Sequence, residues 1–200
     1  MRQESAGRPS EARSRLLGTA TRIFYTEGIH SVGIDRIVAE AQVTRATLYR
    51  HFSSKEDLVL AYLAEVDQAT RAQVDDAVSH GLPAADTVQA LSESIAQGIR
   101  SPGFRGCAFL NAAAEYSDPD HPVHQAVIVH RQWFLDTVTE LLAGVGETPA
   151  EPAARHFVML RDGAMAAGCL FDPDLICETF LRGVDGLLQA HAAPGRVKPI

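Results

Sequence analysis

Apolar residues recur three and four positions apart along most of the chain, and clusters of glycine, proline and aspartate interrupt them. This spacing is typical of helices with one buried face. Ser10–Glu27 carries such a stripe and is followed by Gly28, a residue suited to a helix end. Further helices are predicted over residues 54–79, 84–99, 107–115, 123–145, 149–170 and 173–192. Together with two short helices between residues 33 and 52, they predict an all-α fold of about nine helices, because the sequence has no strand alternation and no internal repeat.

Two short helical patterns follow one another between Gly33 and Leu58. The apolar positions of the first pattern recur at helical spacing and comprise Ile34, Ile37, Val38 and Ala41. Thr44 begins the second helix, because its hydroxyl can accept a hydrogen bond from a free backbone amide of the first turn. A turn of about three residues sets two helices at a steep angle. A helix-turn-helix motif is therefore predicted over about residues 33–52.

The second helix of this motif is predicted to present polar side chains to DNA. We expect Leu48 and Ala46 to face the protein, which leaves five side chains for DNA: Arg45, Thr47, Tyr49, Arg50 and His51. An arginine can bind guanine bidentately, a threonine methyl can contact thymine, and tyrosine and histidine can donate to phosphate oxygens. The next helix begins at Ser53 or Ser54, where Lys55 adds positive charge beside backbone amides that favour an anion. The alternative is an ordinary helical bundle whose surface arginines and lysines only keep the protein in solution.

The same stretch resembles the DNA-binding domain of the tetracycline-repressor-like (TetR) family of transcriptional regulators. The positions that carry the resemblance are Gly28, Ile37, Val43, Leu48, Tyr49, Phe52, Lys55 and Leu58. It covers about residues 10–65, and the run from Tyr49 to Lys55 is its most diagnostic part. The resemblance implies a helix-turn-helix domain over residues 10–70 and a helical effector-binding and dimerisation domain over residues 71–200.

Two positions depart from the usual family pattern. Gln42 stands in the turn where the family commonly has glycine, and a left-handed backbone there would cost a residue with a side chain about 1 kcal/mol. Gly33 stands where the family often has a capping serine or threonine, a difference of only a few tenths of a kcal/mol. A bare backbone at Gly33 would let a DNA phosphate approach closely, so we include Gly33 and Thr44 among the predicted DNA contacts.

The last two long helices are implied by the resemblance to form a homodimer interface through roughly residues 150–192. Small residues in this region would allow close approach of a second subunit; they are Gly163, Ala164, Ala166, Ala167 and Gly168. The alternative is that this face is buried within one subunit. A dimer would present two recognition helices about one turn of DNA apart, which demands a near-palindromic operator.

Charge is divided unevenly along the chain. Residues 1–60 hold nine lysines and arginines against seven acidic residues, whereas residues 61–200 hold nine against eighteen. The first part thus carries a net charge of +2 and the remainder −9. An acidic protein binds nucleic acid poorly without a specific surface, so we expect DNA affinity to be confined to the first third and weakened by salt.

The helices between Tyr62 and Phe157 are expected, from the resemblance, to enclose a pocket for a small organic effector. The candidate residues for this pocket are Tyr62, Phe104, Phe109, Asn111, Glu115, Trp133 and Phe134. For any one of these aromatic side chains, simple packing in the core is the alternative.

The same region contains possible metal ligands, but their arrangement predicts no metal site. Its candidate ligands are Asn111, Glu115, His121, His124 and His130, since imidazoles and carboxylates bind divalent metals. Two of these histidines flank a proline turn, and the spacing matches no compact ligand motif. The sequence indicates no cofactor.

No feature of the sequence indicates an enzyme. The three cysteines, Cys107, Cys169 and Cys177, lack the spacing of a redox or metal motif and fit reduced thiols packed in the core. The longest apolar run falls short of the roughly 18 residues that a membrane span requires, and no export signal is evident at the start. We therefore expect a cytoplasmic protein without a membrane partner.

These expectations combine into a homodimeric, ligand-responsive repressor that binds a near-palindromic operator and is released by a small-molecule effector. Repression is the default that the resemblance implies. Two alternatives remain: an activator with the same DNA contacts, and a helical small-molecule or metal sensor that does not bind DNA.

Overall fold

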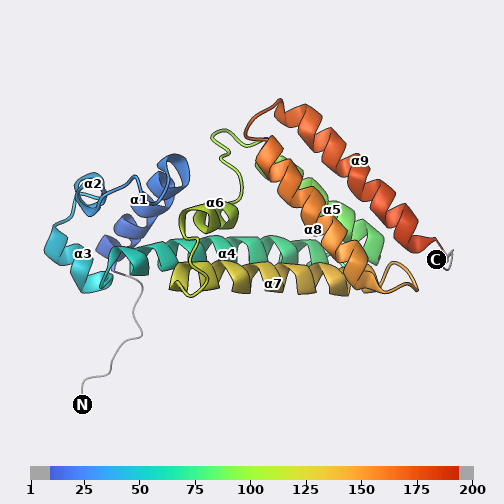
Figure 1. Ribbon diagram of the computed structural model, residues 1–200, viewed down its shortest axis with the longest axis horizontal. Helices are drawn as coiled ribbons and strands as arrows, with labels where there is room; N and C mark the ends of the chain where they lie inside the picture. Colours follow the sequence, from blue (N-terminus) through green and yellow to red (C-terminus); the bar gives the residue numbers. More distant parts are fainter. Residues whose placement is uncertain (1–9, 194–200) are drawn as a thin grey trace, which may run out of the picture. The chain divides into compact units, whose positions relative to one another are not determined.

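The computed structural model describes residues 10–193, and this part of the chain folds into nine α-helices without a strand (Figure 1). The helices are α1 (Glu11–Glu27), α2 (Ile34–Glu40), α3 (Arg45–His51), α4 (Lys55–Ser79), α5 (Ala84–Ile99), α6 (Ala108–Glu115), α7 (Pro122–Ala143), α8 (Ala150–Ala167) and α9 (Pro173–Ala192). The predicted all-α fold is confirmed. Residues 194–200 of the predicted second domain lie outside the described part.

Local side-chain caps determine where several helices begin. The Ser10 hydroxyl accepts a hydrogen bond from the Arg13 amide at 3.2 Å, at the N-terminus of α1. Asp172 accepts one from the Asp174 amide at 2.9 Å, at the N-terminus of α9. Each bond satisfies a first-turn amide that has no partner within its helix. The predicted start of α9 is confirmed, whereas α8 ends at Ala167, three residues before the predicted end.

The chain packs as two compact units. The N-terminal unit comprises the described residues up to Val66 together with 111–127, and the C-terminal unit comprises 67–110 and the described residues from Ile128 onward. Helices α4, α6 and α7 each contribute residues to both units. This division concerns packing within the chain, and the functional boundary at residue 70 stays a prediction.

The core of the N-terminal unit is built where α1, α2 and α3 pack against one another. Leu16 and Ile23 on α1, Ile37 on α2 and Leu48 on α3 are fully buried. Their spacing along each helix places them on one face, so three short amphipathic helices close around a single core.

The core of the C-terminal unit lies between α5, α8 and α9, with α8 and α9 side by side in Figure 1. Phe157 on α8 is fully buried and lies between two aromatic neighbours, with ring centroids 6.5 Å from Phe134 and 6.2 Å from Phe180. Burial of a phenylalanine contributes about 1.5–3 kcal/mol. No helix within residues 10–193 combines the length and the apolar character needed to cross a bilayer.

All three cysteines are free thiols. Cys107 and Cys177 are buried, as expected for core residues. Cys169 is exposed, so the expectation that all three pack in the core is wrong for this residue. It follows the end of α8, where the chain turns toward α9 and leaves the packed interior.

Candidate functional site

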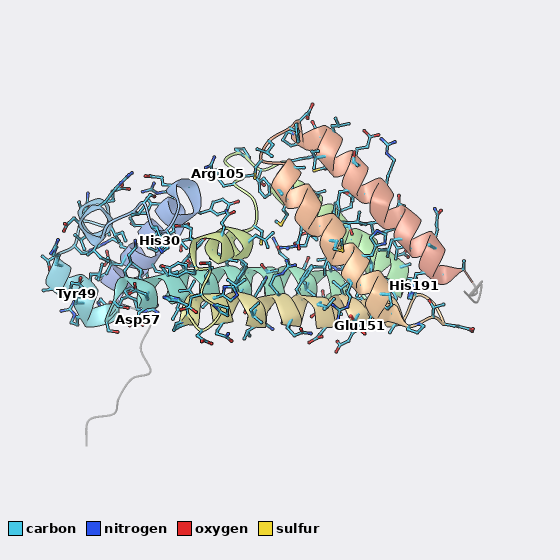
Figure 2. All side chains as sticks on the ribbon, in the orientation of Figure 1. His30, Tyr49, Asp57, Arg105, Glu151 and His191 are labelled. Atoms are coloured by element: carbon cyan, nitrogen blue, oxygen red, sulfur yellow. The ribbon has the colours of Figure 1, made fainter. Side chains whose placement is uncertain are left out.

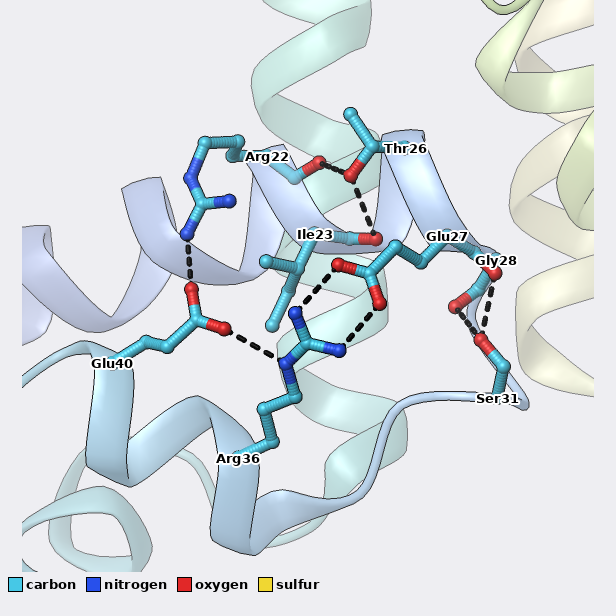
Figure 3. Close-up of polar contacts among 8 residues, drawn as sticks. All are labelled: Arg22, Ile23, Thr26, Glu27, Gly28, Ser31, Arg36 and Glu40. Atoms are coloured by element: carbon cyan, nitrogen blue, oxygen red, sulfur yellow. Dashed lines mark hydrogen bonds and ion pairs between the residues drawn. The ribbon is translucent and has the colours of Figure 1, made fainter.

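A network of ion pairs holds α2 against α1 (Figure 3). The Arg36 guanidinium donates to both carboxylate oxygens of Glu27 at 2.5 and 2.7 Å and to Glu40 at 2.8 Å. Arg22 also donates to Glu40, so this carboxylate joins two arginines. Hydrogen bonds from Arg36 and Arg22 lower the pKa of Glu40. Exposed ion pairs contribute appreciably to stability only when their geometry is bidentate or when they form a network, and this arrangement meets both conditions, so it both orients α2 and stabilises its contact with α1.

The turn between α2 and α3 has the left-handed residue that the sequence predicted. Gln42 has φ of +54°. Its amide donates to the Ala39 carbonyl at 3.2 Å, and the Val43 amide donates to the Val38 carbonyl at 3.0 Å. These two bonds form the Schellman motif that ends many helices, and glycine is its usual residue at the left-handed position. The unusual glutamine therefore adopts the same backbone without the conformational freedom of glycine.

Helix α3 begins at the Thr44 cap, whose hydroxyl accepts from the Thr47 amide at 3.1 Å, and Leu48 anchors it with no exposed surface. The expectation that Ala46 also faces the protein is wrong, because Ala46 is exposed. Two residues of a helix span about 200°, so Ala46 must point away from Leu48. Arg50 lies beside it on the same outward face.

The outward face of α3 carries the side chains that could read DNA. Tyr49 is 51% exposed and is labelled on α3 in Figure 2. Arg50 is exposed, and no carboxylate forms an ion pair with it within residues 10–193. His51 is partly buried and lies 3.1 Å from the Ser10 hydroxyl through its Nε2 atom, so it joins the end of α3 to the start of α1.

Arg45 is held by a partner that sequence reasoning missed. Its Nε and Nη2 atoms donate to the two carboxylate oxygens of Asp35, each at 2.6 Å. The hydrogen bonds to Asp35 raise the pKa of the Arg45 guanidinium. Both side chains are largely exposed, so the pair orients Arg45 at the surface without burying it. The sequence feature that could have indicated this pair is Asp35 in the first turn of α2. An aspartate there is also typical of an ordinary helix N-terminus.

Lys55 and the N-terminus of α4 differ from the simple anion site expected there. The Lys55 ammonium lies 6.0 Å from the centroid of the Phe24 ring, and its partial burial lowers its pKa. The Asp57 amide donates to the Ser54 hydroxyl at 3.0 Å, and the Asp57 carboxylate accepts from the Ser53 amide at 3.1 Å. The anion beside these amides is thus Asp57 itself, and a phosphate contact by Lys55 stays a prediction.

Gly33 leaves the N-terminus of α2 uncovered. It has an extended backbone with φ of −86°, and no side-chain hydrogen bond caps this helix. No heavy atom outside its chain neighbours lies within 4 Å of the position that a Cβ would occupy. The space in front of the first amides of α2 is therefore open, as the close approach of a phosphate would require.

Three of the predicted effector-site residues belong to the N-terminal unit and have partners there. Tyr62 is only 2% exposed and its ring centroid lies 5.9 Å from that of Phe24, while Asn111 also takes part in an interaction. Glu115 accepts hydrogen bonds from the Ile29 amide at 2.8 Å and the His30 amide at 2.6 Å. Glu115 thus secures the loop after α1, a role that sequence spacing did not indicate.

The other predicted effector-site residues belong to the C-terminal unit, where three of them meet polar side chains. Phe109 stacks on His130 at 3.5 Å between centroids, Trp133 lies 4.0 Å below the Arg71 guanidinium, and Phe134 lies 4.8 Å below that of Arg161. Phe104 is partly buried against the apolar core. Three of these aromatics are therefore brought into a shared polar environment, and the arginines above two of them were missed.

The histidines considered as metal ligands form other contacts. His130 Nδ1 lies 2.6 Å from Asp67, and burial lowers the pKa of this imidazole. His121 Nδ1 accepts from the Val123 amide at 3.2 Å, and His124 Nδ1 lies 2.7 Å from the Tyr116 carbonyl oxygen. Over residues 10–193, no group of three or more histidine, cysteine, aspartate or glutamate side chains is arranged to hold a metal.

Helices α8 and α9 and the turn between them leave large apolar side chains in solvent. Met159 is 72% exposed, Leu170 75% and Leu175 57%. A Cβ added at Gly163 or Gly186 would meet no atom of the chain within 4 Å. A groove between the two helices is lined by Pro149, Pro152, Ala153, Leu160, Gly183, Leu187 and Ala190, with four further residues. The alternative of a face buried within one subunit does not hold for these exposed positions, although Ala164 is buried.

Comparison with known proteins places the motif in a family. Residues 16–62 match the family described as "Bacterial regulatory proteins, tetR family". These residues include α2, α3 and the start of α4, which carry the outward side chains described above.

Similarity to a solved structure extends over most of the chain. A TetR-family transcriptional regulator from Streptomyces coelicolor is 70% identical, with a TM-score of 0.90, over 92% of this chain and 97% of that one. The transcriptional regulator LmrA of Bacillus subtilis is 27% identical over 126 residues, or 62% of this chain and 67% of its own length. The transcriptional activator FasR of Mycolicibacterium smegmatis is 45% identical over 53 residues, which are 26% of this chain and 24% of FasR.

Proposed function

We propose that this chain, which belongs to the TetR family of transcriptional regulators, represses transcription as a homodimer and releases its operator when a small molecule binds. The observation that carries the DNA contact is the exposed face of α3, where Arg50 and Tyr49 project from a helix anchored by Leu48. Arginine and tyrosine in a major groove supply base and phosphate contacts. The site of action would be the cytoplasm, where operator DNA is accessible.

The DNA contact is tested by fluorescence-anisotropy titration of the full chain with DNA flanking its own gene, at several salt concentrations. Arg50→Ala should weaken selective binding roughly 5- to 150-fold, the equivalent of about 1–3 kcal/mol for a base contact. Arg105→Ala is the matched control, because Arg105 is an exposed arginine of the C-terminal unit that lies outside both the helix-turn-helix motif and the predicted dimer helices. An equal loss in both variants, or no selective binding to this DNA or a random pool, would reject the proposal.

The homodimer is supported by the exposed apolar face of α8 and α9. Burying side chains such as Met159 and Leu175 against a second copy would remove apolar surface from water at about 25 cal/mol per Å². Exposed glycines on both helices allow close backbone approach. Met159→Glu should convert a dimer to a monomer in analytical ultracentrifugation, and Val129→Glu on α7 is the control because Val129 is also an exposed apolar residue. A monomeric wild-type chain would contradict the proposal.

Release of the operator by an effector requires coupling between the recognition helix and the effector site. Helix α4 begins four residues after α3 and contributes residues to both units, which makes it the element that both sites could bias. An effector can shift the equilibrium only by its difference in affinity for the free and the DNA-bound states. Equal effector affinity for both forms would refute release by ligand.

An activator is the second candidate. FasR is named a transcriptional activator, and 53 of its residues are similar to this chain. A DNA-binding domain related to this one therefore occurs in a protein named an activator. The position of the operator separates the two functions, because a repressor site overlaps the polymerase-binding region and an activator site lies upstream of it. A helical sensor without DNA binding is the further alternative, and the titration above tests it.

A further inference from the structure

One buried arginine of the C-terminal unit has unsatisfied hydrogen-bonding capacity. Arg161 on α8 has a side chain only 7% exposed. Its Nε is the one buried side-chain nitrogen or oxygen atom without a hydrogen-bond partner in residues 10–193. A buried donor without an acceptor is destabilising, and more so on a charged group. Such an atom is able to donate to one further acceptor.

The unsatisfied atom is part of a whole edge of the guanidinium. Nη1 donates to Asp162 at 3.0 Å, whereas Nη2 faces only the Cys107 sulfur at 3.8 Å. A thiol sulfur is a weak acceptor. The edge formed by Nε and Nη2 therefore contacts no oxygen. The corresponding Nε–Nη2 edge of Arg45 donates to both oxygens of the Asp35 carboxylate. A carboxylate therefore fits this edge of an arginine side chain.

Charge at this position is also unbalanced. The Asp162 carboxylate accepts from Arg161 and from both terminal nitrogens of Arg131, at 2.8 and 2.5 Å. Two guanidinium groups thus share one carboxylate, and the three side chains are each less than a quarter exposed. The neighbouring Asp67 carboxylate is already paired with Arg71 at 2.6 Å, so it does not neutralise the surplus positive charge.

Aromatic side chains supply an apolar environment beside this charge. The Arg161 guanidinium lies 4.8 Å from the centroid of Phe134. Trp133 and Phe134 have adjacent rings, with centroids 6.1 Å apart, and Trp133 also neighbours His130. A ligand that combines one negative charge with a flat or aliphatic body matches the surplus positive charge, the donor edge that lacks an oxygen acceptor, and these rings.

We propose that the Nε–Nη2 edge of Arg161 binds the carboxylate of a small organic monoanion, and that this class of molecule is the effector. The assignment as effector rests on the ligand-responsive function proposed above. The carboxylate would replace the weak sulfur contact with two charge-assisted hydrogen bonds, and the apolar body would lie against the aromatic side chains.

The first test uses benzoate and its neutral counterpart benzamide as probes of the full chain, with ionic strength held constant. Benzoate at about ten times its Kd should raise the unfolding midpoint by roughly 3–5 °C, and benzamide should not. The shift should vanish in Arg161→Met and persist in Arg155→Met, which removes an exposed arginine of the same helix. Equal shifts with the two probes, or a benzoate shift that survives in Arg161→Met, would overturn the proposal.

A second pair of variants keeps the test decisive if Arg161→Met does not fold. Cys107→Asp places a carboxylate within the chain where the sulfur faces Arg161, and Cys107→Asn is its neutral isostere. The aspartate variant should unfold at the higher temperature and should no longer respond to benzoate, because its own carboxylate occupies the edge. An aspartate variant no more stable than the asparagine variant would overturn the proposal.

Operator binding is measured on the same samples to separate the two proposals. Benzoate binding that depends on Arg161 but does not weaken operator binding would leave an anion site that is not the effector site, and would overturn the assignment as effector. If the wild-type chain does not bind DNA selectively, the repressor function is rejected. The Arg161 variants would then still show whether the anion site exists.

Discussion

Replacement of Gln42 by glycine should stabilise the protein. Gln42 occupies the left-handed position of the Schellman motif after α2 with φ of +54°. An L-residue with a Cβ pays roughly 1–2 kcal/mol for this conformation, because the Cβ approaches the following carbonyl oxygen. Glycine avoids that contact but loses more backbone entropy on folding, which offsets about 0.5–1 kcal/mol. The net gain in the free energy of unfolding is about 0.5–1 kcal/mol.

The side chain of Gln42 adds little to this balance, because it is exposed. For a chain of 200 residues, a gain of 1 kcal/mol raises the unfolding midpoint by about 2–4 °C, so the expected shift for Gln42→Gly is about 1–4 °C. The assay is thermal unfolding followed by far-ultraviolet circular dichroism at one fixed protein concentration, since dimer formation would make the midpoint depend on concentration.

Gln42→Ala is the control that separates backbone from side chain. Alanine removes the glutamine side chain but keeps the Cβ, so the backbone strain remains and no stabilisation is expected. An unchanged or lower midpoint for Gln42→Gly would refute the argument. Equal stabilisation by alanine and glycine would place the effect in the side chain and refute the backbone explanation.

Three further changes test individual contacts. Asp35→Ala removes the partner of Arg45 and a negative charge near the predicted DNA surface. Anisotropy titrations should therefore show tighter binding to random DNA and weaker discrimination in favour of the operator. Unchanged discrimination would contradict this. Glu115→Gln replaces a charged acceptor of two backbone amides and should lower the free energy of unfolding, measured by urea titration, by about 1–2 kcal/mol. An unchanged urea midpoint would show that the two hydrogen bonds of Glu115 do not stabilise the fold. Burial lowers the pKa of folded His130 below its ordinary 6.5, so the unfolded chain binds the proton more readily and stability should fall as the pH drops through 6.5. His130→Gln, which can still donate to Asp67, should show a smaller fall, and an identical pH profile would argue against a buried neutral imidazole.

The sequence by itself determined most of the helices, because the interactions that define them are local. Ser10, Thr44 and Asp172 each cap an amide two or three residues away, so a short stretch of sequence contains both partners. Apolar residues at helical spacing mark α1 and α5 for the same reason, and Leu16 and Ile23 of α1 and Val88 and Leu91 of α5 are buried. The left-handed backbone at Gln42 was expected from the resemblance to the TetR family, in which glycine is common at this position.

Only the tertiary structure decided which side chains meet. Glu115 accepts from amides 85 and 86 residues earlier in the chain, and no periodicity carries that information. The edge of Arg161 that lacks an oxygen acceptor depends on Cys107, 54 residues away. Helix formation depends on neighbours in sequence, whereas the satisfaction of each polar group depends on how the helices pack, and the candidate sites consist of such groups.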